Sequence, residues 1–154
     1  MLRNEVRATL RAEVLLGLKK IGFGTGRIVG LGGHVEPGET AAEAAVREVA
    51  EESGVRVEVE DLRVGGTVTF RFPARPKWNQ IVSVFVADRF SGRPEESDEI
   101  VPQWFEVDDL PFTKMWDDAR LWLTRVLAGE QISMEIIFAD DCETVSDARF
   151  SAVA

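Results

Sequence analysis

The feature that most constrains this chain is the spacing of charged residues and glycines between residues 33 and 55. Thr40 is followed three residues later by Glu43, which is the spacing of a capping box, so a helix is predicted to begin there. Residues 41–53 contain many good helix formers, and Gly54 stands where helices commonly end. The segment also contains a set of charged residues and glycines at fixed spacing: Gly33, Glu39, Arg47, Glu48, Glu51, Glu52 and Gly54.

Three glutamates of the predicted helix face the same way. At about 100° per residue, Glu48, Glu51 and Glu52 fall on one arc roughly 100° wide, apart from an apolar arc of the same helix. Like charges at this spacing repel by a few tenths of a kcal/mol per pair. A divalent cation would offset that cost, since Mg²⁺ takes oxygen ligands and bridges carboxylates and phosphates. A solvated acidic face is the alternative interpretation. Arg47 is placed to pair with Glu51 one turn on, or to form an ordinary surface ion pair.

The complete pattern resembles the Nudix box, the signature of hydrolases that cut a diphosphate linked to another moiety. The resemblance implies an α/β (α+β) fold with a mixed β-sheet sandwiched between α-helices. It also implies Mg²⁺ as the cofactor, with Mn²⁺ as a substitute. The expected metal ligands are the Gly32 carbonyl, Glu48, Glu51, Glu52 and Glu99. The expected catalytic residues are Glu51 as the favoured base, Glu48 and Glu52 as alternatives, and Arg47 as the residue that orients a glutamate.

Segments beyond the box resemble one branch of the family, the mammalian-type 8-oxo-dGTP diphosphatases related to MutT. They include Leu15-Leu16-Gly17, Glu96-Ser97-Asp98-Glu99, Trp104-Phe105 and Met115-Trp116. The resemblance implies hydrolysis of oxidised nucleoside triphosphates to a monophosphate and pyrophosphate, which sanitises the nucleotide pool. It places these residues at the substrate: Lys19, Phe23, Val29, Phe70, Phe72, Trp116 and Asp118.

Two positions depart from that branch. Val29 replaces an asparagine that binds the base, and Ala119 replaces the second of two adjacent aspartates. Each missing hydrogen bond to a base edge removes about 1–3 kcal/mol of discrimination. Other substrates therefore stay open: another dNTP or NTP, ADP-ribose or a nucleotide sugar. A nucleotide-binding module without turnover is the remaining alternative.

Length, composition and charge narrow the possible partners and location of the protein. The chain has 154 residues, 45% of them hydrophobic, and is expected to form a single Nudix domain over residues 1–154. A net charge of −9 argues against a nucleic-acid polymer as partner, and no apolar run approaches the length of a membrane span. The expected partner is a small nucleotide, with no protein partner implied. The lone Cys142 and the absence of a signal-peptide core favour the cytoplasm.

Hydrophobic alternation and turn residues predict the remaining elements. A glycine-rich loop is expected over 21–30, a turn over 91–94, and a helix over 117–127 that ends at Gly129. An apolar run covers 14–18. Strands are expected over 6–10, 55–59, 65–72, 81–88 and 102–107, and a closing hairpin over 134–138 and 142–150.

Overall fold

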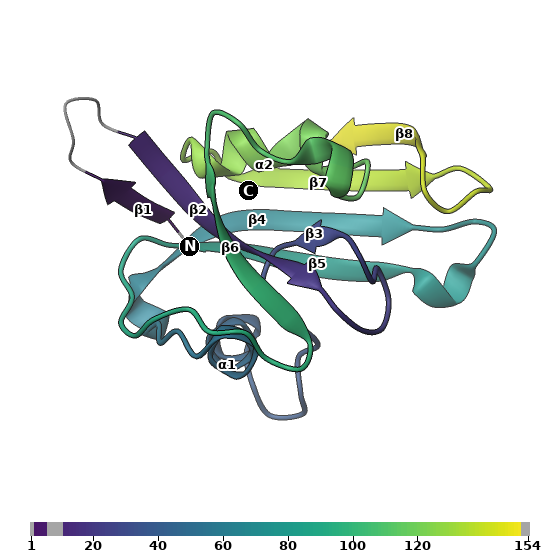
Figure 1. Cartoon of the computed structure of the whole chain (residues 1–154). Helices are drawn as coiled ribbons and strands as arrows, with labels where there is room; N and C mark the ends of the chain where they lie inside the picture. Colours follow the sequence, from purple (N-terminus) through teal and green to yellow (C-terminus); the bar gives the residue numbers. More distant parts are fainter. Residues whose placement is uncertain (1, 6–10, 152–154) are drawn as a thin grey trace. The chain divides into compact units, whose positions relative to one another are not determined.

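The computed structural model describes residues 2–5 and 11–151, with side chains from residue 12 onward. The chain divides into two compact units. The first comprises Met1–Arg63 and Val86–Met115, and the second comprises Val64–Phe85 and Trp116–Ala154. Figure 1 shows the elements of both.

The first unit is built on an antiparallel sheet with β2 (Arg11–Lys19) at its centre. Strand β2 pairs with β1 (Leu2–Glu5), with β3 (Ile28–Val29) and with β6 (Ile100–Glu106). Its apolar run is buried, which explains why these residues form an interior strand. The pair β2–β3 closes the glycine-rich segment, so that segment contains a short strand which the sequence did not predict. The strand predicted over 6–10 lies outside the described residues.

Helix α1 (Ala41–Ser53) has the predicted bounds. The Thr40 side chain accepts a hydrogen bond from the Glu43 N–H, and the Glu43 side chain accepts one from the Thr40 N–H, which completes the capping box. Gly54 ends the helix in the left-handed conformation, with φ of 75°, where a side chain would be strained. The acidic face of the box is therefore on a helix with both ends fixed.

The prediction of a strand over 55–59 is wrong. Only Arg56 pairs there, in an isolated bridge with Ser91, and Val59 already belongs to the 3-10 helix η1 (Val59–Asp61). The alternation in burial is nevertheless real, because Val55 and Val57 are buried between exposed neighbours. Alternating burial needs only an extended chain, whereas a strand also needs a partner along its length.

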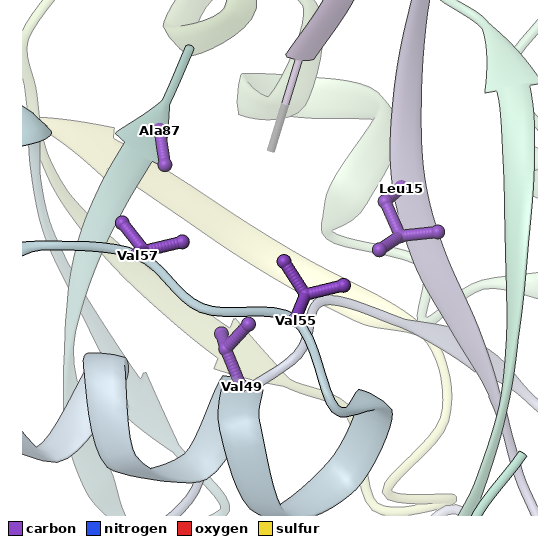
Figure 2. Close-up of a cluster of buried hydrophobic side chains, with 5 residues drawn as sticks. All are labelled: Leu15, Val49, Val55, Val57 and Ala87. Carbon is purple, nitrogen blue, oxygen red and sulfur yellow. The ribbon is translucent and has the colours of Figure 1, made fainter. Parts of the chain in front are cut away.

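Helix α1 is attached to the first unit by a hydrophobic cluster. Val49 on the helix and Val55 and Val57 after it pack with Leu15 of β2 and with Ala87 (Figure 2). Full burial of an aliphatic side chain of this size contributes about 1.5–3 kcal/mol. The cluster therefore holds the glutamate-bearing helix against the strand that leads into the glycine-rich loop.

The second unit contains the mixed sheet. Its strands are ordered β5 (Gln80–Ala87), β4 (Leu62–Arg71), β7 (Ile132–Phe138) and β8 (Val145–Phe150), and the chain crosses between the units within β4 and β5. Strands β4 and β7 are parallel, and β7 and β8 form the predicted antiparallel hairpin. Mixed pairing together with α1 and α2 confirms the predicted α+β class.

Helix α2 (Ala119–Leu127) packs against β7 and begins two residues later than predicted. Asp117 and Asp118 form a turn ahead of it, because the Asp117 carboxylate accepts a hydrogen bond from the Val145 N–H at the start of β8. Gly129 follows the helix with a positive φ, as expected. Two further 3-10 helices are η2 (Pro76–Trp78) and η3 (Phe112–Lys114). None of the helices in the described part of the chain has the length and apolarity to span a membrane.

Candidate active site

The last two turns of α1 present the three box glutamates in different environments. The Glu52 side chain is buried, Glu48 is largely covered and Glu51 is 58% exposed. The Glu52 carboxylate accepts a hydrogen bond of 2.8 Å from the Gly32 N–H. The segment at Gly32, ahead of the helix, therefore lies directly on the acidic face.

Glu52 is the electrostatic centre of this group. The pKa of Glu52 is raised to about 7, chiefly by burial and also by the nearby carboxylates of Glu48 and Glu99, against the lowering effect of the Gly32 N–H and Lys19. Glu99 comes from the loop before β6, almost fifty residues along the chain. The fold thus brings Gly32, Glu48 and Glu99 close to Glu52 in one acidic region of the first unit.

The backbone at Gly33 packs against Glu48. A Cβ at Gly33 would lie 2.5 Å from the Glu48 carboxylate carbon and 2.6 and 2.8 Å from its two oxygens. Contacts that short do not occur, so any side chain here would displace the carboxylate. Glycine is therefore needed at this box position because any side chain there would displace the Glu48 carboxylate.

Arg47 connects the loop to the helix. Its guanidinium donates to Glu48 at 2.8 Å and to Glu51 at 3.2 Å, which confirms the predicted pairing with Glu51. It also binds both oxygens of Glu39 and the His34 carbonyl. These bonds lower the pKa of Glu39 and raise that of Arg47. No role for Glu39 was predicted, because it precedes the helix and its eight-residue spacing from Arg47 matches no helical contact.

The donor chemistry of the region fits a hard divalent cation, because carboxylate and carbonyl oxygens are the ligands that Mg²⁺ prefers. Within residues 2–5 and 11–151, no three His, Cys, Asp or Glu side chains converge as a ready-made metal site. Arg47 holds Glu48 and Glu51, while Gly32 holds Glu52. Arg47 engages one carboxylate oxygen of Glu48 and one of Glu51, so a cation would be held through the second oxygen of each.

The predicted substrate residues fall in both units. In the first, Lys19 lies close enough to Glu52 to lower its pKa, Phe23 is 40% exposed, and Val29 is half-buried in β3. The Lys19 main chain is hydrogen-bonded across the loop that carries Phe23, to Gly26 and Arg27. These three residues therefore lie on or beside the loop that leads to Gly32.

In the second unit, Phe70, Phe72 and Trp116 surround Phe138. Phe72 stacks on Phe138 with centroids 4.6 Å apart, and the half-buried Trp116 meets Phe138 edge-on at 6.1 Å. Phe70 lies 6.2 Å from the same ring. Trp116 also borders a pocket, so it is the member of this aromatic cluster best placed to stack on a ligand.

Asp118 is buried in the second unit, and its carboxylate accepts a hydrogen bond of 2.8 Å from the Trp122 indole N–H. Burial raises the pKa of Asp118. Ala119, at the second aspartate position, is also buried. Asp117 points elsewhere, toward Val145 and Arg120.

Sequence reasoning missed part of the pocket beside Trp116. Arg75 and Trp78 line it, with the Arg75 guanidinium 4.8 Å from the Trp78 ring centroid, and so do residues 140–143. A tryptophan after a Pro-Lys pair was the available signal. It carried no information about position, because Trp78 and Trp116 come to line the same pocket only through the fold of the second unit.

Comparison with known proteins identifies a family and similar hydrolases. The NUDIX domain model matches residues 5–126. An oxidized purine nucleoside triphosphate hydrolase from Danio rerio is 46% identical over 115 residues, which is 75% of this chain and 72% of that protein. The protein of that name from Mus musculus is 42% identical over 128 residues, covering 83% and 80%.

Among solved structures, a MutT protein from Bacillus halodurans superposes with a TM-score of 0.74 at 21% identity and covers 90% of this chain and 89% of that one. At that identity the likeness concerns the fold. The family match covers most of the chain and includes the whole segment from Gly33 to Val55. This chain therefore belongs to the Nudix family of hydrolases.

Proposed function

We propose that the protein hydrolyses oxidised purine nucleoside triphosphates such as 8-oxo-dGTP to a nucleoside monophosphate and pyrophosphate, and so removes them from the nucleotide pool. The observation that carries this proposal is the similarity to two hydrolases named for that substrate class over three quarters or more of the chain. The acidic region around Glu52 supports the reaction, because it would hold the divalent cation that compensates the negative charge of the phosphates during cleavage.

The proposed cofactor is Mg²⁺, with Mn²⁺ as a substitute. Glu48, Glu51, Glu52 and Glu99 would hold it together with the Gly32 carbonyl. A cation bound there would lower the pKa of the attacking water and neutralise charge on the phosphates. The excess negative charge around the buried Glu52 supports this assignment.

Glu51 is the proposed general base, with Glu48 and Glu52 as alternatives. Its carboxylate is exposed, so it is accessible to a water molecule, and the Arg47 guanidinium fixes its orientation. Arg47 holds Glu48 in the same way. Arg47 is therefore proposed to orient the glutamates rather than to contact the reacting phosphate.

In the second unit, Trp116 is proposed to stack on the base, an interaction worth about 1–3 kcal/mol. Asp118 is proposed to bind the base edge, and Phe70 and Phe72 to support the aromatic cluster around Phe138. In the first unit, Lys19, Phe23 and Val29 are proposed substrate contacts. The ammonium of Lys19 is suited to a phosphate.

The proposal extends to the organisation and location of the protein. Residues 1–154 are proposed to act as one Nudix domain, since the family match spans segments of both units. The buried, unpaired Cys142 supports a reducing compartment such as the cytoplasm.

The decisive experiment is formation of nucleoside monophosphate with Mg²⁺ across 8-oxo-dGTP, 2-hydroxy-dATP, the normal dNTPs and NTPs, 5-methyl-dCTP and ADP-ribose, ranked by kcat/KM. We expect 8-oxo-dGTP to lead the normal nucleotides by at least tenfold, about 1.4 kcal/mol. A clear preference for ADP-ribose would replace the proposed substrate class. Tight nucleotide binding without turnover would instead indicate a binding module.

A further inference from the structure

The loop that carries Glu99 is fixed to the first unit at both ends by main-chain hydrogen bonds. At its start, the Glu95 N–H donates to the carbonyl of Ser53, the last residue of α1, at 2.8 Å. At its end, the Lys20 N–H donates to the Glu99 carbonyl at 2.8 Å. The two ends of the loop are therefore bonded to the neighbours of Glu52 and Lys19 in the sequence, namely Ser53 and Lys20.

The middle of this loop turns on Ser97. The Ser97 N–H donates to the Ile100 carbonyl at 3.0 Å, and the Ser97 hydroxyl accepts from the N–H groups of Glu99 and Ile100. These bonds shape the turn, but they lie within the turn itself. They do not fix it to the rest of the unit.

The Lys20 side chain supplies that attachment. Its ammonium donates to the Glu96 carboxylate at 2.6 Å and to the Ser97 carbonyl at 3.0 Å. The Lys20 and Glu96 side chains are 34% and 58% exposed, and exposed pairs of this kind add at most about 1 kcal/mol to stability. The contact is therefore better suited to fixing the local position of the loop than to stabilising the fold.

We propose that Lys20 is a positioning residue for the divalent-cation site, because its ammonium holds the Glu96–Ser97 turn and thereby keeps Glu99 beside Glu52. The inference rests on the metal site of the proposed function. It extends that site to a residue that touches neither metal nor substrate. A lysine acting on Glu99 in this way affects cation binding in the absence of nucleotide, whereas a lysine that binds phosphate does not.

The test is binding of Mn²⁺ alone, measured by electron paramagnetic resonance of free Mn²⁺, on the full chain without nucleotide. Lys20→Met is expected to weaken Mn²⁺ binding about tenfold, as other partners of metal ligands do. Lys20→Arg should restore most of the loss, because a guanidinium can donate to both acceptors. The matched control is Lys114→Met, an exposed lysine of η3, which should bind Mn²⁺ as the unmodified protein does.

A double-mutant cycle shows whether Lys20 acts through Glu99. Glu99→Gln alone should weaken Mn²⁺ binding, and adding Lys20→Met should then change nothing further. Unchanged binding in Lys20→Met, unchanged binding in Glu99→Gln, or full additivity of the two would each overturn the inference. Thermal unfolding of every variant identifies a folding defect, and Glu96→Gln replaces Lys20→Met if the latter does not fold.

The proposed hydrolysis can fail independently of this inference. A protein that shows the Lys20–Glu99 coupling but does not cleave 8-oxo-dGTP would contradict the proposed substrate and support the positioning role. A protein that cleaves 8-oxo-dGTP while its Lys20→Met variant binds Mn²⁺ normally would support the proposed substrate and contradict the positioning role.

Discussion

The guanidinium of Arg47 binds the carboxylate of Glu39 through two parallel hydrogen bonds, from Nη2 at 2.7 Å and from Nε at 3.1 Å. This pair joins the loop before α1 to the middle of the helix. The same guanidinium binds Glu48 and Glu51 through Nη1. The loop partner therefore fixes the arginine, and the arginine fixes two of the glutamates.

Arg47→Lys should lower kcat by about ten- to a hundredfold, the usual effect of losing a residue that orients functional ligands. An ammonium cannot form the two parallel bonds to Glu39 and also reach Glu48 and Glu51. Steady-state kinetics at saturating Mg²⁺ provide the measurement. Arg120→Lys, at an exposed ion pair of α2, is the control. Equal kcat in the Arg47→Lys variant and the unmodified protein would refute the orienting role.

Glu52→Gln should lower kcat by several orders of magnitude while the protein stays folded. The amide keeps the size of the side chain and can still accept from the Gly32 N–H, but it removes the buried negative charge. Circular dichroism and thermal unfolding establish that the variant folds, and product formation measures the loss. Turnover near that of the unmodified enzyme would mean that Glu52 is not a metal ligand.

Gly33→Ala should fold but turn over substrate about ten- to a hundredfold more slowly, because small displacements of a catalytic group have effects of this size. The added Cβ must displace the Glu48 carboxylate, which is the flexible end of a side chain, so the backbone can stay in place. Gly30→Ala is the matched control, since a Cβ there meets nothing within 4 Å. If the two alanine variants lose the same activity, the effect does not come from Glu48.

The two aspartates before α2 should respond to pH in opposite directions. Burial raises the pKa of Asp118, so its folded form binds more protons than the unfolded chain, and its contribution to stability falls as pH rises through the folded pKa. Asp118→Asn should therefore gain stability relative to the unmodified protein as pH rises. Urea unfolding between about pH 2 and 8 measures this difference.

The control for that experiment is Asp117→Asn. The Arg120 guanidinium holds the pKa of Asp117 below its usual range, so the stability it contributes is present above the unfolded pKa and lost as pH falls through the folded pKa. Asp117→Asn should thus lose stability at neutral pH and match the unmodified protein at low pH. Parallel pH profiles for the two variants would contradict both assignments.

Val29→Asn combined with Ala119→Asp should increase the preference for oxidised purines. The two changes restore polar groups that the related branch uses at the base, each worth about 1–3 kcal/mol of discrimination. The ratio of kcat/KM for 8-oxo-dGTP to that for dGTP is the quantity to compare. An unchanged ratio in the double variant would show that these positions do not contact the base.

Local signals were sufficient to predict helix α1. The capping box at Thr40, the helix formers after it and Gly54 are all short-range features, and the structure has the helix within the predicted bounds. The hairpin of β7 and β8 was also predicted, because alternation and turn residues act over a few positions. The strand predicted over 55–59 was wrong because its partner at Ser91 lies far away in sequence and pairs with only one residue.

The sequence by itself determined the family, the reaction class and the residues of the box, since these depend on identity and spacing along one helix and its loop. The tertiary structure decided which carboxylate is buried, that Glu39 fixes Arg47, and that Lys20 holds the turn beside Glu99. Burial and contacts between distant residues depend on how the chain packs, and local spacing carries no record of them.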